Sequence, residues 1–239
     1  MAFAQYLAMT AAEMMGNAPP AEGVAWMACH FSPYSTGLCN LPHALPPGSL
    51  LILNDRTPIH GHDASRVCRE LSQALDALQC AGLLLDFQNP PCSEALALAS
   101  YLAEHLDCPM AVTPEYASGN AAVFAPAVPT DTPVSVYLEQ WAGKSVWLEA
   151  ALEGQTIALR PDGATFGRNP GPVGGAVHRD RRLHCHYTME KTQDCFRFRT
   201  WRTREDLAQL LEEAGRLGVR LSVGLYQELR EPPPPDGRH

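Results

Sequence analysis

The sequence contains no apolar run near the length that crosses a membrane, which is about 18–20 residues. Its N-terminal segment, residues 2–15 (AFAQYLAMTAAEMM), is apolar, but it lacks the basic residues that open a secretory signal peptide and it contains Glu13. We therefore expect a short helix or a poorly ordered extension there, not a leader. Without an export signal, the protein is expected to be cytoplasmic.

Cysteine pairs with metal-binding or redox spacing are also missing. Cysteines lie at positions 29, 39, 68, 80, 92, 108, 185 and 195, and none forms a C-x-x-C pair. In a reducing compartment they are expected to pack as free thiols. No G-x-G-x-x-G or G-x-x-x-x-G-K-[ST] loop follows a predicted strand, so no dinucleotide or nucleotide cofactor is expected.

Basic charge is scarce relative to acidic charge. The chain has 18 Lys and Arg against 26 Asp and Glu, a formal net charge of −8 and a pI near 5.5. Nucleic acids and anionic membranes are bound through basic surfaces, so we expect neither as a main partner. The one basic run, Arg179–Arg182, contains an acid and is predicted to be a solvated loop.

Short apolar runs alternate with helical patterns along the chain. Buried strands are predicted at Val24–His30, Leu50–Asn54, Gly82–Phe87 and Val219–Tyr226. Helices are predicted from Asp63 to Gln79, from Ser93 to Leu106 and from Thr203 to Leu217. This alternation favours a parallel sheet with right-handed crossovers. We predict an α/β fold, a (β/α)8-type barrel that is reduced or irregular, with six or seven core strands. An open doubly wound sheet is the alternative.

The chain length suits one barrel domain. Its 239 residues are 46% hydrophobic and 18% charged, as in a globular protein. We expect residues 1–230 to form a single domain and residues 231–239 (EPPPPDGRH) to be a disordered tail. Residues 144–195 are predicted to be an insertion, in which Ser145–Ala150 and Gln155–Arg160 form a β-hairpin and Pro161–Arg182 is a long loop.

In a parallel barrel, chemistry is carried by residues at the C-terminal ends of the strands. Polar residues follow apolar runs at four places: Asp55, Asp86 with Gln88, Glu115, and Gln227 with Glu228. The two-residue period of a strand aims Leu84, Asp86 and Gln88 to the same side. Such residues also cap helices and solvate loops, which is the structural alternative at each position.

Residues 81–88 (AGLLLDFQ) resemble the signature strand of the family 18 glycoside hydrolases, the chitinase-like proteins, written D-G-x-D-x-D-[FWY]-E. Gly82, Asp86 and Phe87 match this pattern, whereas Ala81 and Leu84 stand where the family has aspartates. The resemblance implies a barrel in which the final Glu protonates the glycosidic oxygen. The preceding Asp then orients the substrate N-acetyl group, which acts as the internal nucleophile.

Gln88 stands in place of the family's catalytic Glu. A glutamine amide donates and accepts hydrogen bonds but holds no transferable proton, so the family mechanism is predicted to be disabled. Asp86 and Glu115 are the candidate catalytic residues if a divergent activity survives, with Glu228 as a further acid.

The last predicted strand also resembles the family. Residues 218–229 (GVRLSVGLYQEL) are similar to the family's final strand, where an aromatic residue lies under the sugar, and Tyr226 would take that place. The partner implied is an oligosaccharide or glycan. Its candidate binding residues are Gln88, Tyr226, Gln227, Asp55 and Tyr34.

Two other functions remain open. His60 and His62, with the second pair His184 and His186, have the H-x-H spacing of metal-dependent hydrolases, in which imidazoles converge on a divalent ion. For the first pair a polar loop is the favoured explanation, because the pair follows Thr57-Pro58 in a loop and Asp63 is the predicted N-cap of a helix. The third hypothesis is a protein-interaction scaffold with no small-molecule site, which the acidic surface and the long loop would suit.

Overall fold

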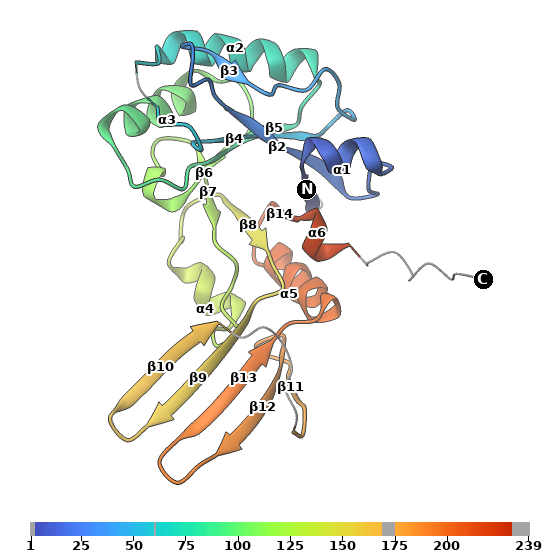
Figure 1. The fold of residues 1–239 in the computed structure, drawn as a ribbon, viewed down its shortest axis with the longest axis vertical. Coiled ribbons are helices and arrows are strands. Elements are labelled where there is room, and N and C mark those ends of the chain that lie inside the picture. The colour runs from blue at the N-terminus through green and yellow to red at the C-terminus, as the bar shows by residue number, and fades with distance from the viewer. Residues whose placement is uncertain (1–2, 60, 169–174, 231–239) are drawn as a thin grey trace, which may run out of the picture. The chain divides into compact units, whose positions relative to one another are not determined.

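The structure, a computed structural model, describes residues 3–59, 61–168 and 175–230 (Figure 1). The chain divides into two compact units. The first contains residues 1–125, 143–149 and 219–226, and the second contains residues 126–142, 150–218 and 227–239. No helix in the described ranges is long and apolar enough to span a membrane. The predicted tail, residues 231–239, lies outside the described residues.

The first unit is a closed parallel barrel of eight strands in the described part of the chain. They are β1 (Ala4–Met9), β2 (Gly23–Phe31), β4 (Leu50–Asn54), β5 (Gly82–Asp86), β6 (Met110–Val112), β7 (Ala122–Ala125), β8 (Val146–Ala150) and β14 (Leu221–Leu225). Their order is β1-β14-β8-β7-β6-β5-β4-β2, and a parallel pairing of β1 with β2 closes the ring. The predicted (β/α)8-type barrel is confirmed, and the open sheet is excluded.

The barrel begins earlier than the sequence suggested. Residues 4–9, expected to be helical or poorly ordered, form β1, which pairs with both β2 and β14. Only the following short helix α1 (Ala11–Gly16) agrees with the prediction, and Glu13 closes its capping box with Thr10. The physical reason is that β1 gains two strand neighbours, and this pairing overrides a weak helical pattern. The Gly82 strand is therefore the fourth strand of the barrel.

Helices cover one side of the barrel strands. The covering elements are α2 (Ala64–Ala77), α3 (Ser93–His105) and the short η1 (Pro114–Tyr116), while β3 (Leu38–Cys39) pairs antiparallel with β2. Asp63 caps α2 as predicted, because its carboxylate accepts the backbone N–H groups of Ser65 and Arg66 at 2.8 and 3.2 Å. Fully buried Leu71 on α2 and Leu102 on α3 pack in one core cluster with outward-facing strand residues such as Leu85.

A second cluster contains strand residues only. Each of the eight barrel strands contributes to it, and no helix does, so the cluster fills the inside of the barrel. Its buried members are Ala8, Ala25, Leu50, Ile52, Leu84, Ala111, Ala122, Trp147 and Val223. This set shows which residue of each strand faces inward. Because side chains alternate along a strand, a polar residue two or four positions after one of these residues also faces inward.

The second unit contains an antiparallel sheet and two helices. Its strands are β9 (Gly154–Arg160), β10 (Gly163–Arg168), β11 (His178–Asp180), β12 (Cys185–Lys191) and β13 (Phe196–Trp201), in the order β10-β9-β13-β12-β11. The helices are α4 (Val134–Glu139) and α5 (Arg204–Arg216), and α6 (Tyr226–Leu229) ends the described elements.

Two local predictions in this region were wrong. Residues 145–150 do not form a hairpin with residues 155–160, because β8 pairs with β7 in the barrel whereas β9 pairs with β10 and β13. The segment expected to be one long loop contains β10 and β11. Pro161 and Asp162 form the turn between β9 and β10, and residues 169–174 of this segment lie outside the described residues (Figure 1).

A buried cation holds the second unit together. Arg202 is 4% exposed, and its guanidinium donates to the backbone carbonyls of Val128, Pro129, Leu183 and His184. Burial lowers the pKa of Arg202 to about 10. Carbonyl dipoles thus replace water around a charged group that would otherwise be costly to bury.

Candidate functional site

Asp86 and Gln88 lie together at the C-terminal end of the fourth barrel strand. Leu84 belongs to the interior cluster, so Asp86 and Gln88, two and four residues further on, continue the inward-facing side. Asp86 is half-buried and Gln88 is exposed. The Gln88 side-chain amide donates a hydrogen bond to the Asp86 carboxylate. Asp86, which matches the family pattern, and Gln88, which departs from it, thus form one polar group at the barrel mouth.

The environment of Asp86 shifts the pKa of its carboxyl upward. Burial raises the pKa of the Asp86 carboxyl, the hydrogen bond from Gln88 lowers it, and the negative charge of Asp55 raises it again, with a net upward shift. Raised pKa values are typical of carboxyls that act as hydrogen-bond donors or acids. Asp86 stays a candidate site residue.

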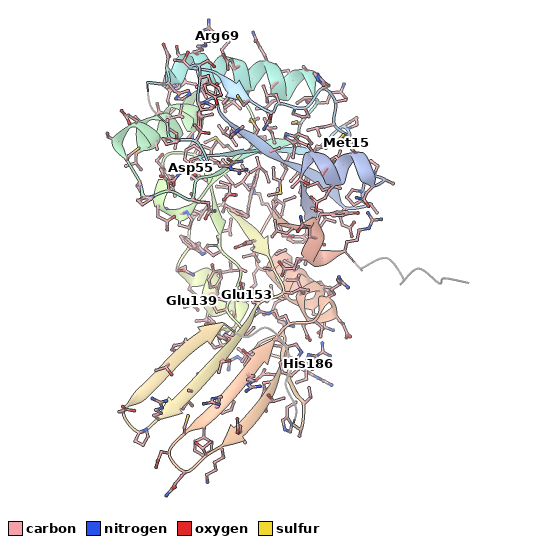
Figure 2. The ribbon with its side chains drawn as sticks, viewed as in Figure 1. Met15, Asp55, Arg69, Glu139, Glu153 and His186 are labelled. Atoms are coloured by element: carbon pink, nitrogen blue, oxygen red, sulfur yellow. The ribbon has the colours of Figure 1, made fainter. Side chains whose placement is uncertain are left out.

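Asp55, labelled in Figure 2, follows β4 and holds the backbone of the segment after β5. Its side chain is buried, at 3% exposure, and its two carboxylate oxygens accept the backbone N–H groups of Gln88 and Asn89 at 2.8 and 2.9 Å. The Asn89 amide returns a hydrogen bond to the Asp55 carbonyl at 2.6 Å. Asp55 therefore positions the segment after β5, and its predicted contact with a ligand stays a prediction.

Sequence reasoning missed Asn54, the residue before Asp55. Asn54 is level with Asp86 in the β4–β5 register and continues the inward-facing positions Leu50 and Ile52. Its amide donates to the Met27 carbonyl at 3.2 Å. The two-residue period of side chains within residues 50–54 predicts that Asn54 faces inward. The prediction of a strand buried on both faces did not distinguish the inward-facing from the outward-facing residues.

Glu149 was missed for a different reason. Trp147 of β8 lies in the interior cluster, so Glu149, two residues on, occupies an inward-facing position at the end of the seventh barrel strand, where it is exposed. Because residues 145–150 were predicted to form a hairpin outside the barrel, Glu149 was not among the predicted strand-end residues. It adds a carboxylate to those that follow the barrel strands.

Glu115 lies on η1, directly after β6, and is exposed. Its neighbour Tyr116 is 2% exposed, packs edge-on against Phe87 with ring centres 5.2 Å apart, and donates from its hydroxyl to the Asn89 carbonyl. Tyr116 thus anchors the same loop that Asp55 holds. A cavity of about 280 Å³ lies among these residues, lined by Asp55, Asn89, Cys92 and Tyr116, whereas Asp86 and Gln88 are not part of its lining.

The remaining predicted binding residues have different environments. Tyr226 is the first residue of α6 and is 7% exposed, while the inward-facing period of Leu221 and Val223 continues to Leu225. Tyr34, at 96% exposure, lies in the turn between β2 and β3. Gln227 is exposed and belongs to the second unit.

Glu228, the further candidate acid, also belongs to the second unit. Its carboxylate accepts the backbone N–H of Leu152. The roles of Tyr34, Tyr226, Gln227 and Glu228 stay predictions.

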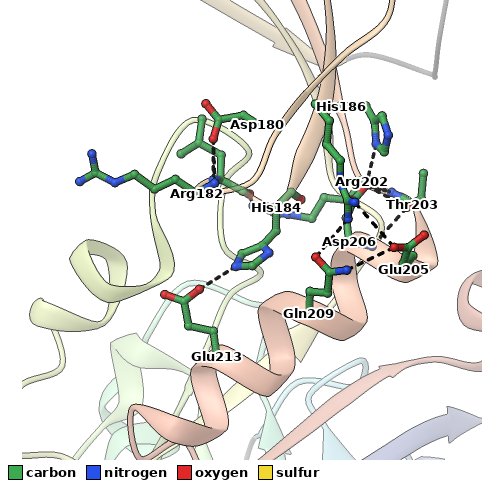
Figure 3. Close-up of polar contacts among 12 residues, drawn as sticks. Asp180, Arg182, His184, His186, Arg202, Thr203, Glu205, Asp206, Gln209 and Glu213 are labelled. Carbon is green, nitrogen blue, oxygen red and sulfur yellow. Dashed lines mark hydrogen bonds and ion pairs between the residues drawn. The ribbon is translucent and has the colours of Figure 1, made fainter.

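The histidine pairs give no metal site in the described part of the chain. No group of three or more His, Cys, Asp or Glu side chains suited to hold a metal ion occurs there. His60 lies outside the described residues, and the His62 ring packs edge-on against Phe31 at 5.0 Å. His184 and His186 each bond a different acid of α5, Glu213 and Asp206, both at 2.7 Å (Figure 3).

Comparison with known proteins shows what the barrel is similar to. No protein-family profile and no curated protein matches the sequence. Solved structures do match. The chitinase-like agglutinin RobpsCRA from Robinia pseudoacacia superposes with a TM-score of 0.57 at 11% identity, over 95% of each chain. The fold is chitinase-like.

Two further matches support the same conclusion. A mutant GH18 chitinase from Cycas revoluta, in complex with (GlcNAc)4, gives a TM-score of 0.53 at 11% identity and covers 92% of this chain and 94% of its own. The spore cortex-lytic enzyme SleL from Bacillus megaterium gives 0.53 at 12% identity, over 93% of this chain and 70% of its own. The family resemblance of residues 81–88 and the chitinase-like fold agree.

Proposed function

We propose that this protein is a chitinase-like barrel that binds an N-acetylglucosamine-type oligosaccharide at its mouth without the family's catalytic acid. The carrying observation is the hydrogen-bonded pair of Asp86 and Gln88 at the end of the fourth barrel strand. In a parallel barrel, this end carries the binding groups. The fold supports a glycan, since a neighbour with this fold is complexed with (GlcNAc)4 and another is an agglutinin.

Each residue of the pair suits binding. The Gln88 amide keeps a donor and an acceptor for sugar hydroxyl or N-acetyl groups while it holds Asp86. Asp86, with its pKa raised by burial, is suited to share a hydrogen bond with an amide or hydroxyl of the ligand. The glutamine amide cannot supply a proton to a leaving group. We therefore propose that the oligosaccharide is bound and not hydrolysed by the family mechanism.

Titration calorimetry with the N-acetylglucosamine tetrasaccharide tests this proposal. We expect saturable binding by the wild type, and Asp86→Ala should weaken it at least about tenfold, the effect of losing one charge-assisted hydrogen bond. Glu104→Ala, which removes an exposed carboxylate from α3, is the matched control and should bind like the wild type.

Two results would contradict the proposal. One is the absence of both heat and a rise in melting temperature at millimolar tetrasaccharide, because a ligand of the folded state must stabilise it. The other is equal binding by Asp86→Ala and the wild type. Release of sugar by the wild type in the same solutions would show a divergent hydrolase, in which another acid replaces Gln88.

A further inference from the structure

The antiparallel sheet of the second unit has two chemically different faces. Cross-strand partners share a face, and alternate residues of a strand point to opposite faces. The pairings of β9, β10, β12 and β13 therefore place the strongly exposed Leu159, Phe166, Met189 and Phe196 on one face. The other face is polar and basic. We call it the arginine face, defined by Arg160, Arg197, Arg199 and Trp201, with Thr156, Thr165 and Thr188 between them.

The charge of this sheet departs from that of the chain. Residues 154–201 contain eight Lys and Arg and four Asp and Glu, a formal net charge of +4 within a chain whose net charge is −8. The three arginines that point from the strands β9 and β13 all lie on the arginine face. Among the paired residues of β9, β10, β12 and β13, the arginine face carries these three arginines against one acid, Glu190, which is a local excess of positive charge on an acidic protein.

The arginines are arranged in a line along the strands. Arg197 and Arg199 are two residues apart on β13, a spacing of about 7 Å, and Arg160 lies one step further on the neighbouring strand β9. Glu190 of β12 is 3.8 Å from Arg197 and partly neutralises it. For Arg160 and Arg199, the described residues provide no ion-pair partner within 4 Å. Two of the three cations are thus available to a ligand.

An aromatic residue continues this line. Trp201 follows Arg199 by two residues on β13, is half-buried, and stacks on His186 with ring centres 6.0 Å apart. His186 is fixed in turn by its 2.7 Å hydrogen bond to the fully buried Asp206 (Figure 3). On the β10 strand, Gly163 and Gly167 also lie on the arginine face. No side chain or backbone of the described residues covers them, because a Cβ added at either glycine would meet nothing within 4 Å.

We propose that the arginine face docks an anionic polysaccharide, a linear glycan that carries carboxylate groups. Arginine binds carboxylates in a bidentate manner, and the part of the Trp201 indole that stays exposed can contact the apolar face of a sugar ring. The hydroxyls of Thr156 and Thr165 can bond to sugar hydroxyls, whereas Thr188 is buried. The choice of a glycan rests on the function proposed above. The net charge of −8 opposes the long-range attraction of any polyanion, so we expect short-range contacts between the arginines and a few carboxylates of the glycan, and binding of nucleic acid is an outcome that the test below distinguishes.

Binding of polygalacturonate, with neutral dextran as the comparison, tests this face in the full-length protein. We expect polygalacturonate to bind, more weakly at 300 than at 50 mM NaCl, and dextran to bind at least about tenfold more weakly. The double variant Arg160→Gln/Arg199→Gln should lose about tenfold in affinity. Arg181→Gln/Arg182→Gln, which removes the same charge from the exposed turn after β11, should change it less than about twofold.

Several outcomes would overturn the assignment. Equal losses in the two double variants would show a general charge effect and no specific face. Equal binding of dextran and polygalacturonate would exclude carboxylate recognition. Tighter binding of single-stranded DNA than of polygalacturonate would make nucleic acid the partner. If polygalacturonate fails to bind while the N-acetylglucosamine tetrasaccharide still does, the arginine face is rejected and the barrel proposal stands.

Discussion

The Asp55 carboxylate accepts the backbone N–H of Gln88 at 2.8 Å, so a buried acid after one barrel strand fixes the residue that follows the next strand. Its second oxygen holds Asn89 in the same way. The position of the Gln88 side chain beside Asp86 is thus set by a residue that need not touch a ligand.

Replacing Asp55 should therefore affect both stability and binding. In Asp55→Asn one of the two acceptor oxygens becomes an amide N–H₂ that faces a backbone N–H, which should lower the free energy of unfolding by about 2 kcal/mol. Urea unfolding measures this loss, and tetrasaccharide titration should show weaker binding because Gln88 moves. Asp76→Asn on the exposed face of α2 is the control. If Asp55→Asn is as stable as the wild type and binds the tetrasaccharide equally well, Asp55 does not position Gln88.

Gln88→Glu tests whether only the acid is missing. The new carboxyl would lie within hydrogen-bond reach of Asp86, and two carboxyls sharing one proton have one pKa strongly raised. The variant should then hydrolyse an aryl N-acetylglucosaminide about a hundredfold faster than the wild-type background, the scale of one general acid. Gln88→Ala controls for loss of the amide. If the Gln88→Glu and Gln88→Ala rates agree, a proton donor at this position is not what limits activity.

The same variant should show a characteristic pH dependence of stability. A carboxyl whose pKa is raised in the folded state contributes stability that is complete below its unfolded pKa, about 4, and is lost as the pH rises through the folded value. Gln88→Glu should therefore be more destabilised relative to the wild type at pH 8 than at pH 5 in urea unfolding. An unchanged difference between the two pH values would mean that the carboxyls do not interact.

Gly82, the matching glycine of the chitinase-like segment, has a packing role. A Cβ built there would lie 2.5 Å from the Pro109 carbonyl oxygen and 3.2 Å from the Trp147 ring inside the barrel. Gly82→Ala should lower the free energy of unfolding by about 1–3 kcal/mol, the usual cost of overpacking. Gly16→Ala, where a Cβ meets nothing within 4 Å, should be close to neutral by the same thermal or urea measurement. Two equally stable variants would contradict the close approach.

Asp206 should stabilise the second unit in a pH-dependent way. Burial acts to raise the pKa of Asp206, but hydrogen bonds from Thr203, Arg179 and His186 outweigh it, and the net shift is downward. Its stabilisation is therefore complete above the unfolded pKa, about 4, and is lost as the pH falls through the folded value. Asp206→Asn should cost about 3 kcal/mol at pH 7, because it breaks a buried charged network.

That cost should shrink between pH 5 and pH 3, as followed by urea unfolding at each pH. Glu205→Gln, next to Asp206 but exposed, is the control and should be nearly silent at every pH. A constant Asp206→Asn penalty across this range would mean that the carboxylate is not ionised preferentially in the fold.

The sequence predicted what depends on local patterns. The apolar runs 50–54 and 82–87, the Asp63 and Thr203 caps and the Gly218 helix end, at a φ of 98°, all follow from neighbouring residues alone. It failed where partners distant in the chain decide. β1 is a strand because β2 and β14 flank it, and the strand β8 is a barrel member because β7 lies beside it.

The site shows the same division. The two-residue period correctly placed Asp86 and Gln88 on one side of β5. The role of Asp55 was not predictable, because it depends on the loop that follows a different strand, and Glu149 was hidden by the error about β8. Residues chosen because they end a strand thus include both inward-facing groups and groups that hold loops.

The barrel strand nearest the N-terminus has the last strand, β14, as a neighbour, and more than 200 residues separate the two. During synthesis on the ribosome, one edge of β1 stays unpaired until residues 221–225, which form its partner β14, have emerged. Ring closure is therefore a late, long-range step, which makes folding slow and exposes the nascent chain to aggregation. A chain released before residue 219 would keep that edge open however well its other seven strands pair.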